Sequence, residues 1–147
     1  MRVEALTSHD VLVEVPVTVT SEHTLGRSFR CAMRGLREAW EGEPNFRFQV
    51  AAALTVALCG FLVRLSLREW TWIAVAAGFV LMAELMNTAI ERVVDLAVGL
   101  RPDPLARQTK DLAAGFVLVA SASAAIIGLL IFVPHLISGW RVGAFAS

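Results

Sequence analysis

The 147-residue chain lacks the features that mark several common classes of protein. It has no tyrosine, only three scattered histidines, and two cysteines without metal-ligand spacing, so we expect free thiols at Cys31 and Cys59 and no histidine-based metal site. Acidic and basic side chains balance at 13 each, which excludes a general nucleic-acid-binding surface. No cleavable signal peptide is expected, because Glu14 and Pro16 interrupt the apolar stretch near the N-terminus.

Polar residues are also scarce, and this indicates a membrane protein. Hydrophobic residues make up 56% of the chain and the mean hydropathy is +0.64, which is high for so short a soluble domain. Three apolar runs, at about residues 48–65, 70–91 and 111–137, are long enough to cross a bilayer. Proline, glycine and polar residues between them predict breaks at residues 41–45, 66–69 and 96–108.

The N-terminal part of the chain divides into two segments. Residues 1–24 alternate valine with polar residues, as strands do, but a lone strand has no partner, so we expect a flexible extension or an edge strand formed on assembly. Residues 25–41 repeat apolar side chains every three or four positions, with arginines between them. This pattern predicts a basic amphipathic helix on an anionic membrane surface, with a surface helix of a soluble bundle as the alternative.

Basic residues are unevenly distributed between the predicted loops. Five arginines lie within residues 25–47, and residues 92–110 carry three arginines and Lys110, which is the only lysine. The turn between the first two spans has two arginines, and the C-terminal end has one. The positive-inside rule therefore predicts that the N-terminus and the second loop face the cytoplasm.

A column of polar residues ends the second apolar run. Glu84, Asn87, Glu91 and Asp95 are spaced by three, four and four positions, which places them on one stripe of a helix. Glu84 lies within hydrophobic sequence, where an ionised carboxylate is costly unless it is paired, bound to metal or neutral. A carboxylate in such surroundings is suited to accept a proton from a hydroxyl group.

Three further polar residues are predicted to lie at the same membrane face as this column. Glu43 begins the first span, and Lys110 and Asp111 begin the third. A cluster of carboxylates needs a cation, and Mg²⁺ binds such groups together with phosphate oxygens, while lysine supplies a point charge for phosphate. These are parts of a phosphoryl-transfer site, although the sequence contains neither a P-loop nor a kinase glycine-rich loop.

Each of these residues also has a structural interpretation. Glu91, Asp95 and Asp111 are typical of solvated helix ends, Asn87 of an interhelical hydrogen bond, and Lys110 of a membrane anchor. A cation or proton carrier that uses Glu84, or a non-enzymatic partner of other membrane helices, is an alternative function. The concentration of carboxylates at one membrane face favours phosphoryl transfer.

Residues 84–95 (ELMNTAIERVVD) resemble the signature of the integral-membrane prokaryotic diacylglycerol kinase and undecaprenol kinase family. The resemblance covers residues 27 to about 134 and includes the segments SFRCAMRGL (28–36), EPNFR (43–47), SLREW (66–70) and ARQTKDLAAG (106–115). It implies an all-α kinase domain over residues 25–147, in which a surface helix precedes three transmembrane helices. It also implies a homotrimer in the bacterial cytoplasmic membrane, with composite sites between subunits that face the cytoplasm.

The resemblance implies a role for each site residue. Mg²⁺-bound ATP would phosphorylate a lipid alcohol, with Glu84 as the catalytic base and Asn87 ordering the reacting groups. Glu43 and Glu91 would hold Mg²⁺. The residues that contact the nucleotide would be Arg27, Cys31, Glu43, Glu91, Arg101, Lys110 and Asp111. The residues that contact the lipid would be Arg37, Trp40, Arg47, Glu84 and Ala114. Cys31 stands where the family often has a tyrosine.

The expected lipid is undecaprenol, which would be converted to undecaprenyl phosphate. The residue types at positions 68–70, 87–89, 110–115 and 131–134 resemble more closely the branch of the family that phosphorylates undecaprenol. Phosphorylation of diacylglycerol to phosphatidic acid is the alternative, because that branch shares the catalytic residues. The predicted partners are thus a nucleotide, a membrane lipid and two further copies of the chain.

Overall fold

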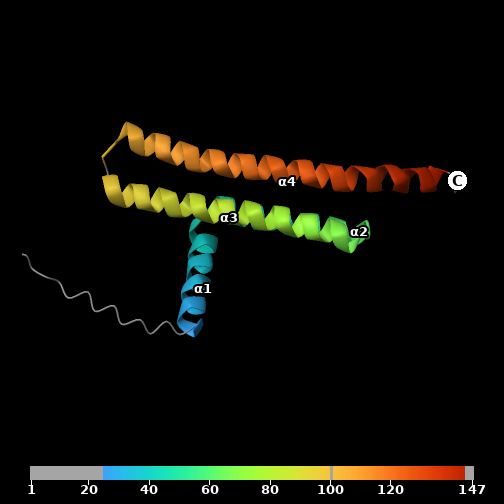
Figure 1. Ribbon diagram of the computed structural model, residues 1–147, viewed down its shortest axis with the longest axis horizontal. Coiled ribbons are helices and arrows are strands. Elements are labelled where there is room, and N and C mark those ends of the chain that lie inside the picture. The colour runs from blue at the N-terminus through green and yellow to red at the C-terminus, as the bar shows by residue number, and fades with distance from the viewer. Residues whose placement is uncertain (1–24, 100, 145–147) are drawn as a thin grey trace, which may run out of the picture.

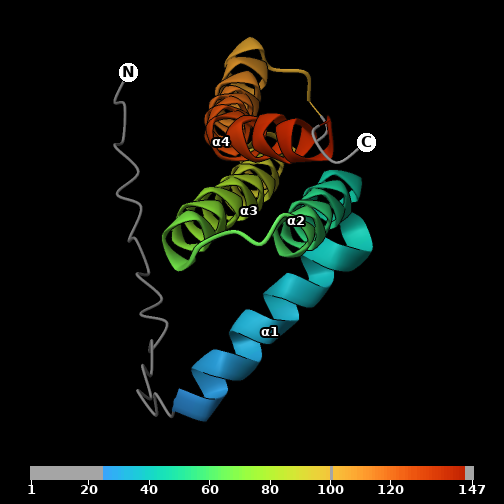
Figure 2. The same cartoon turned by 90° about the vertical axis from the view of Figure 1, so that its right-hand side faces the viewer.

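The computed structural model describes residues 25–99 and 101–144, with side chains described as far as residue 137, so the predicted extension over residues 1–24 lies outside it. The described residues form four helices: α1 (Leu25–Gly42), α2 (Pro44–Leu62), α3 (Leu67–Val98) and α4 (Pro104–Ala144). α3 and α4 run side by side along the long axis, and α1 leaves them at a steep angle (Figure 1). α2 lies beside α3 in the view turned by 90° (Figure 2).

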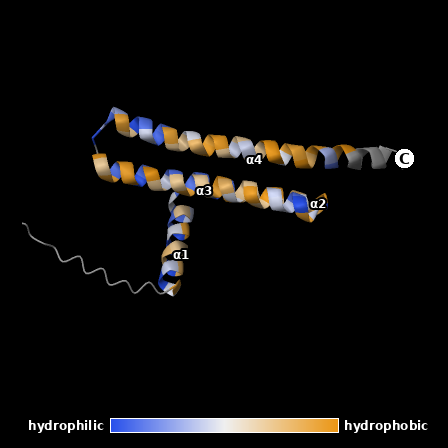
Figure 3. Cartoon of the chain, viewed as in Figure 1, coloured by the Kyte–Doolittle hydropathy of each residue, from blue (hydrophilic) through white to orange (hydrophobic). Residues whose placement is uncertain are grey.

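Within the described part of the chain, three helices are long and apolar enough to cross a membrane: α2, α3 and the part of α4 from Pro104 to Ile137. Orange, hydrophobic stretches dominate α3 and α4, whereas blue and orange alternate along α1 (Figure 3). Large apolar side chains remain exposed on the three helices, among them Phe48, Leu58, Leu118 and Leu130. Lipid contact accounts for this exposure, because soluble monomers rarely expose apolar patches of such extent. The prediction of an all-α protein with three spans is confirmed.

α3 packs chiefly against α4, and its buried residues recur every three or four positions. They are Ile73, Ala76, Val80, Ala83, Glu84, Asn87 and Thr88. Val80 and Ala83 form a small hydrophobic core with Ala120, against which Val117 and Ala124 also pack. Small side chains let the two helices approach closely, as is usual between membrane helices. Glu84 and Asn87 continue this buried stripe toward the C-terminal end of α3.

The turn between α2 and α3 lies earlier than predicted. Residues 66–69 are not a turn, because Ser66 is the N-cap of α3 and the helix begins at Leu67. The Ser66 hydroxyl accepts the Glu69 N–H at 3.4 Å, and the Glu69 carboxylate accepts the Ser66 N–H at 2.7 Å, which forms a capping box. The chain instead reverses just before Ser66, where Arg64 adopts a φ of 58°.

The predicted loop over residues 96–108 is wrong at both ends. α3 continues to Val98 and stops at Gly99, whose φ of 61° favours glycine. Asp103 Oδ1 accepts the N–H groups of Leu105 at 2.7 Å and of Ala106 at 3.0 Å, so Asp103 caps α4. Pro104 does not prolong the loop, because proline is well suited to the first position of a helix. Both helices therefore extend beyond the apolar runs that predicted them.

A single residue, Glu43, joins α1 to α2, so the predicted break over residues 41–45 is also too wide. Glu43 has φ −112° and ψ 106°, and Pro44 is the first residue of α2. Arg47 Nη1 donates to the carbonyl oxygens of Trp40 at 3.0 Å and Glu41 at 3.2 Å. Arg47 thereby satisfies carbonyl groups that the end of α1 would leave without partners.

Candidate active site

The polar column predicted on α3 passes from buried to exposed along the helix. Glu84 is 3% exposed and Asn87 is 8% exposed. Glu91 is half-buried and Asp95 is exposed. Glu84 and Asn87 are among the buried residues of α3, whereas none of the residues after Thr88 in this helix is buried. Glu84 is therefore the least hydrated carboxylate of the column.

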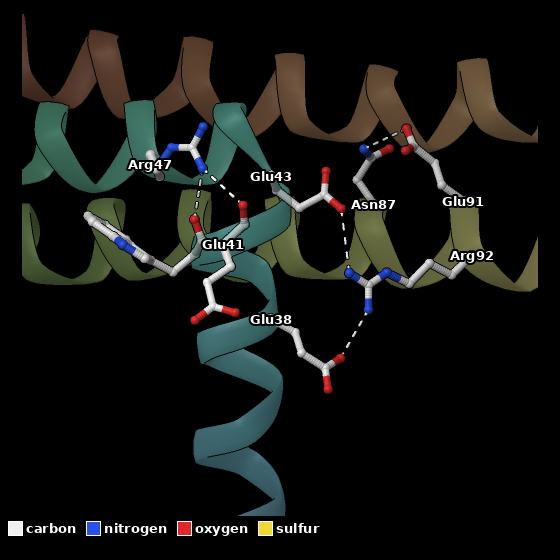
Figure 4. Close-up of polar contacts among 8 residues, drawn as sticks. Glu38, Glu41, Glu43, Arg47, Asn87, Glu91 and Arg92 are labelled. Atoms are coloured by element: carbon white, nitrogen blue, oxygen red, sulfur yellow. Dashed lines mark hydrogen bonds and ion pairs between the residues drawn. The ribbon is translucent and has the colours of Figure 1, made fainter.

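Asn87 connects the buried end of the column to Glu91. Its Nδ2 donates to Glu91 Oε1 at 3.0 Å (Figure 4). Its Oδ1 is buried and has no hydrogen-bond partner among the described residues. A buried oxygen without a partner costs about 1–3 kcal/mol, so a hydrogen-bond donor from a bound ligand or water fits this position. The orphaned oxygen therefore marks a position beside the column that suits a polar ligand.

Glu43 adds a carboxylate from the joint between α1 and α2. Its Oε1 lies 3.6 Å from Arg92 Nη2, and Arg92 Nη1 lies 3.3 Å from Glu38 Oε2 (Figure 4). Within one chain, Glu43 thus lies against α3 beside Arg92, the residue that follows Glu91. No local pattern indicates the role of Arg92, because Glu38 is 54 positions away in the sequence.

The carboxylates fit a metal ion only together with another ligand. No group of three or more His, Cys, Asp or Glu side chains within residues 25–99 and 101–137 is placed to hold a metal ion. Glu43 and Glu91 supply two carboxylates, and Mg²⁺ commonly binds one or two carboxylates plus substrate phosphates and water. The donor set therefore fits Mg²⁺ that arrives with a nucleotide, and it does not fit a closed metal centre.

A second polar group lies where α3 meets α4. Lys110 Nζ forms an ion pair with Asp95 Oδ1 at 2.5 Å. A pocket of about 590 Å³ opens there, and its charged lining residues are Asp95, Arg101, Asp103, Arg107, Lys110 and Asp111. This volume is within the range of small-molecule sites, about 300–1,000 Å³. The pocket's three cationic side chains are balanced by three carboxylates, and Lys110 is paired with Asp95. Arginine and lysine are nonetheless the side chains that bind the phosphates of a nucleotide.

Arg27 and Cys31 are not brought to the other predicted site residues of the same chain. Both are exposed on the N-terminal half of α1, which points away from α3 and α4 (Figure 1). At a rise of 1.5 Å per residue, Cys31 lies about 18 Å along the helix from Glu43. Within one chain they cannot share a ligand phosphate with Glu43 and Glu91.

The residues predicted to contact a lipid are divided between α1, the start of α2 and α4. Arg37 forms an ion pair with Glu41 at 2.7 Å, and Trp40 is exposed near it. A crevice of about 460 Å³ separates α1 from α3, lined mainly by small and apolar residues, which include Leu36, Ala39, Leu85 and Ala89. Ala114 does not line this crevice and is exposed on α4. No sequence pattern predicts the crevice, because it depends on how α1 is set against α3.

Comparison with known proteins places the chain among kinases. Residues 30–132 match the family described as prokaryotic diacylglycerol kinase. The chain is 49% identical over 110 residues to the undecaprenol kinase of Bacillus subtilis, an alignment that spans 75% of this chain and 89% of that protein. It is 38% identical over 111 residues to a diacylglycerol kinase of Synechocystis sp., spanning 76% and 63% of the two chains. It is 31% identical over 118 residues to a diacylglycerol kinase of Helicobacter pylori, spanning 80% and 84%.

Proposed function

Because this chain belongs to the prokaryotic diacylglycerol kinase family and is a multi-pass membrane lipid kinase, we propose that it transfers the γ-phosphate of ATP to undecaprenol. The family resemblance predicted from the sequence is confirmed. Lipid kinase activity also decides against the carrier and non-enzymatic interpretations of the carboxylate column. A nucleotide and a membrane lipid are accordingly the two substrates.

The observation that carries the proposed chemistry is the buried carboxyl group of Glu84. It is 3% exposed and lies about one helical turn from Asn87, whose Oδ1 has no hydrogen-bond partner among the described residues. A carboxylate with few water partners is well placed to take a proton from an alcohol that reaches it from the membrane. The exposed end of the same column faces the polar pocket at the α3–α4 turn, where a nucleotide would bind.

The transfer proceeds in one step. The alcohol oxygen forms a bond to the γ-phosphorus, the bond from that phosphorus to the β–γ bridging oxygen breaks, and ADP leaves. The alcohol proton passes to the Glu84 carboxylate and later to water. Asn87 fixes Glu91 through the hydrogen bond from its Nδ2. Bound Mg²⁺, held by Glu43 and Glu91, would neutralise phosphate charge during transfer.

The remaining predicted residues bind the two substrates. Arg101, Lys110 and Asp111 contact the nucleotide from the pocket at the α3–α4 turn. Arg27 and Cys31 contact it from α1 of a neighbouring subunit in a homotrimer, which accords with their separation from Glu43 within one chain. The residues that guide the lipid are Arg37, Trp40, Arg47 and Ala114. The distribution of arginine supports a site and an N-terminus on the cytoplasmic side.

Undecaprenol is favoured as the acceptor by the higher identity to the Bacillus subtilis undecaprenol kinase over most of that protein's length. Diacylglycerol is the second candidate, because two of the relatives are diacylglycerol kinases and the same residues would serve that reaction. The test is phosphate transfer from Mg²⁺-ATP to each lipid at equal mole fraction in the same micelles. A higher kcat/KM for undecaprenol is expected, and a preference for diacylglycerol would refute this acceptor.

The role of Glu84 is tested by Glu84→Gln, which keeps the size of the side chain and removes the base. Turnover should fall by about 10²–10⁴-fold, the usual contribution of general-base catalysis, while size-exclusion chromatography shows unchanged assembly. Glu69→Gln is the matched control, because Glu69 lies near the opposite end of α3. An active Glu84→Gln variant would remove Glu84 from the role of base.

A further inference from the structure

Arg92 lies next to Glu91 and connects α3 to the end of α1. Its Nη1 is 3.3 Å from Glu38 Oε2 and its Nη2 is 3.6 Å from Glu43 Oε1 (Figure 4). A Cβ atom on Gly42 would lie 3.8 Å from Nη2, so the guanidinium group sits close to the last residue of α1. The C-terminal end of a helix carries partial negative charge, which favours a cation in this place.

The two carboxylates assigned to the cation are held in the same manner. Glu91 Oε1 accepts a hydrogen bond from Asn87 Nδ2 at 3.0 Å, and Glu43 Oε1 faces Arg92 Nη2. In each group the contact uses one carboxylate oxygen, so the other oxygen remains for another partner. Outer partners that fix one atom of a ligating group, and so orient the atom that binds, are the rule at metal sites.

We infer that Arg92 is a positioning residue that orients the Glu43 carboxylate toward the divalent cation and its nucleotide, an inference that rests on the proposed function. The guanidinium fork holds Glu38 with one nitrogen and Glu43 with the other. Because a single residue joins α1 to α2, the direction of the Glu43 side chain depends on how α1 is set against α3. Arg92 therefore holds α1 against α3 and orients the Glu43 side chain through the same guanidinium group.

The contribution of Arg92 is to cation binding and not to folding. The side chains of Arg92 and Glu38 are 51% and 53% exposed, and ion pairs this exposed contribute little to stability. Loss of an outer partner at a metal site, by contrast, typically lowers metal affinity or activity by about 10–100-fold. A variant at Arg92 should therefore separate the two properties.

The experiment measures Mn²⁺ affinity by electron paramagnetic resonance, with a non-hydrolysable ATP analogue and the full-length protein in micelles. Arg92→Gln should bind Mn²⁺ about tenfold more weakly and unfold at the wild-type temperature. Arg68→Gln makes the same substitution at an exposed site near the other end of α3 and should retain wild-type affinity. Wild-type affinity in Arg92→Gln would overturn the inference.

Two further variants test whether Arg92 orients the Glu43 carboxylate or only links α3 to α1, which we call a tether. Glu38→Ala removes the contact with α1 but keeps Nη2 near Glu43, so its loss of affinity should be smaller than that of Arg92→Gln. Equal losses would overturn the inference in favour of a tether. Arg92→Lys replaces the two guanidinium nitrogens by one ammonium group, so this variant should bind Mn²⁺ more weakly than the wild-type protein. Undiminished affinity would contradict the inference that Arg92 must contact Glu38 and Glu43 simultaneously. Because the titration needs no turnover, its outcome is separate from a failure of the wild-type protein to phosphorylate either lipid.

Discussion

The corner between α2 and α3 leaves no room for a side chain at Gly60, so Gly60→Ala tests the packing directly. A Cβ atom there would lie 2.9 Å from Leu65 Cδ1, 3.0 Å from Trp70 Cη2 and 3.1 Å from Trp70 Cζ2. The end of Leu65 can rotate away. The Trp70 ring is less free, because it packs against Phe61 with ring centroids 4.7 Å apart. The tryptophan ring therefore decides the cost of the substitution.

Two opposing contributions set the expected magnitude. Overpacking typically destabilises a protein by about 1–3 kcal/mol, whereas replacing glycine by alanine within a helix gains about 0.5–1 kcal/mol. The net loss for Gly60→Ala should be about 1 kcal/mol. At about 2–4 °C per kcal/mol, the unfolding temperature should fall by a few degrees.

The assay is thermal unfolding in detergent, followed by circular dichroism. Gly78→Ala is the control, since nothing lies within 4 Å of a Cβ atom there, and it should stabilise α3 by about 0.5–1 kcal/mol. Trp70→Phe removes the benzo ring that Gly60→Ala meets, so the double variant should be more stable than the sum of the single effects predicts. If Gly60→Ala were as stable as Gly78→Ala, or gained nothing from Trp70→Phe, the packing described for this corner would be wrong.

Two other predictions concern the two ends of α3. Asn87→Ala removes the hydrogen bond to Glu91 and should lower kcat/KM for phosphate transfer by about 10–100-fold, with assembly retained on size-exclusion chromatography; wild-type kinetics would exclude Asn87 from the site. Ser66→Ala removes the N-cap hydroxyl and should lower the free energy of unfolding by about 0.5–2 kcal/mol, with kcat unchanged at temperatures where the protein stays folded. An unchanged unfolding temperature would contradict the capping box.

Local patterns in the sequence predict the helices and the column on α3 because both depend on spacing within one helix. The positions of Glu84, Asn87 and Glu91 follow from intervals of three and four residues. The helix ends were predicted less well, because residues common in turns also cap helices. Asp103 caps α4 with its carboxylate, and Pro104 begins that helix instead of excluding it.

Contacts between distant parts of the chain have no such local signal. The pairing of Arg92 with Glu38 depends on the angle between α1 and α3, which nothing within either segment specifies. The orphaned oxygen of Asn87 likewise emerges only when its neighbours are in place. The contacts of Arg27 and Cys31 cannot be derived from a single chain, since their proposed partners belong to another subunit.

The one-residue joint at Glu43 has a mechanical consequence. Its φ and ψ of −112° and 106° set the angle between α1 and α2, and the same two torsions fix the direction of its Cα–Cβ bond. The angle between α1 and α2 and the starting direction of the Glu43 side chain therefore depend on the same two torsions. A rotation about either bond that tips α1 against α2 also turns the Glu43 Cα–Cβ bond, so the angle between the two helices and the placement of this carboxylate change together.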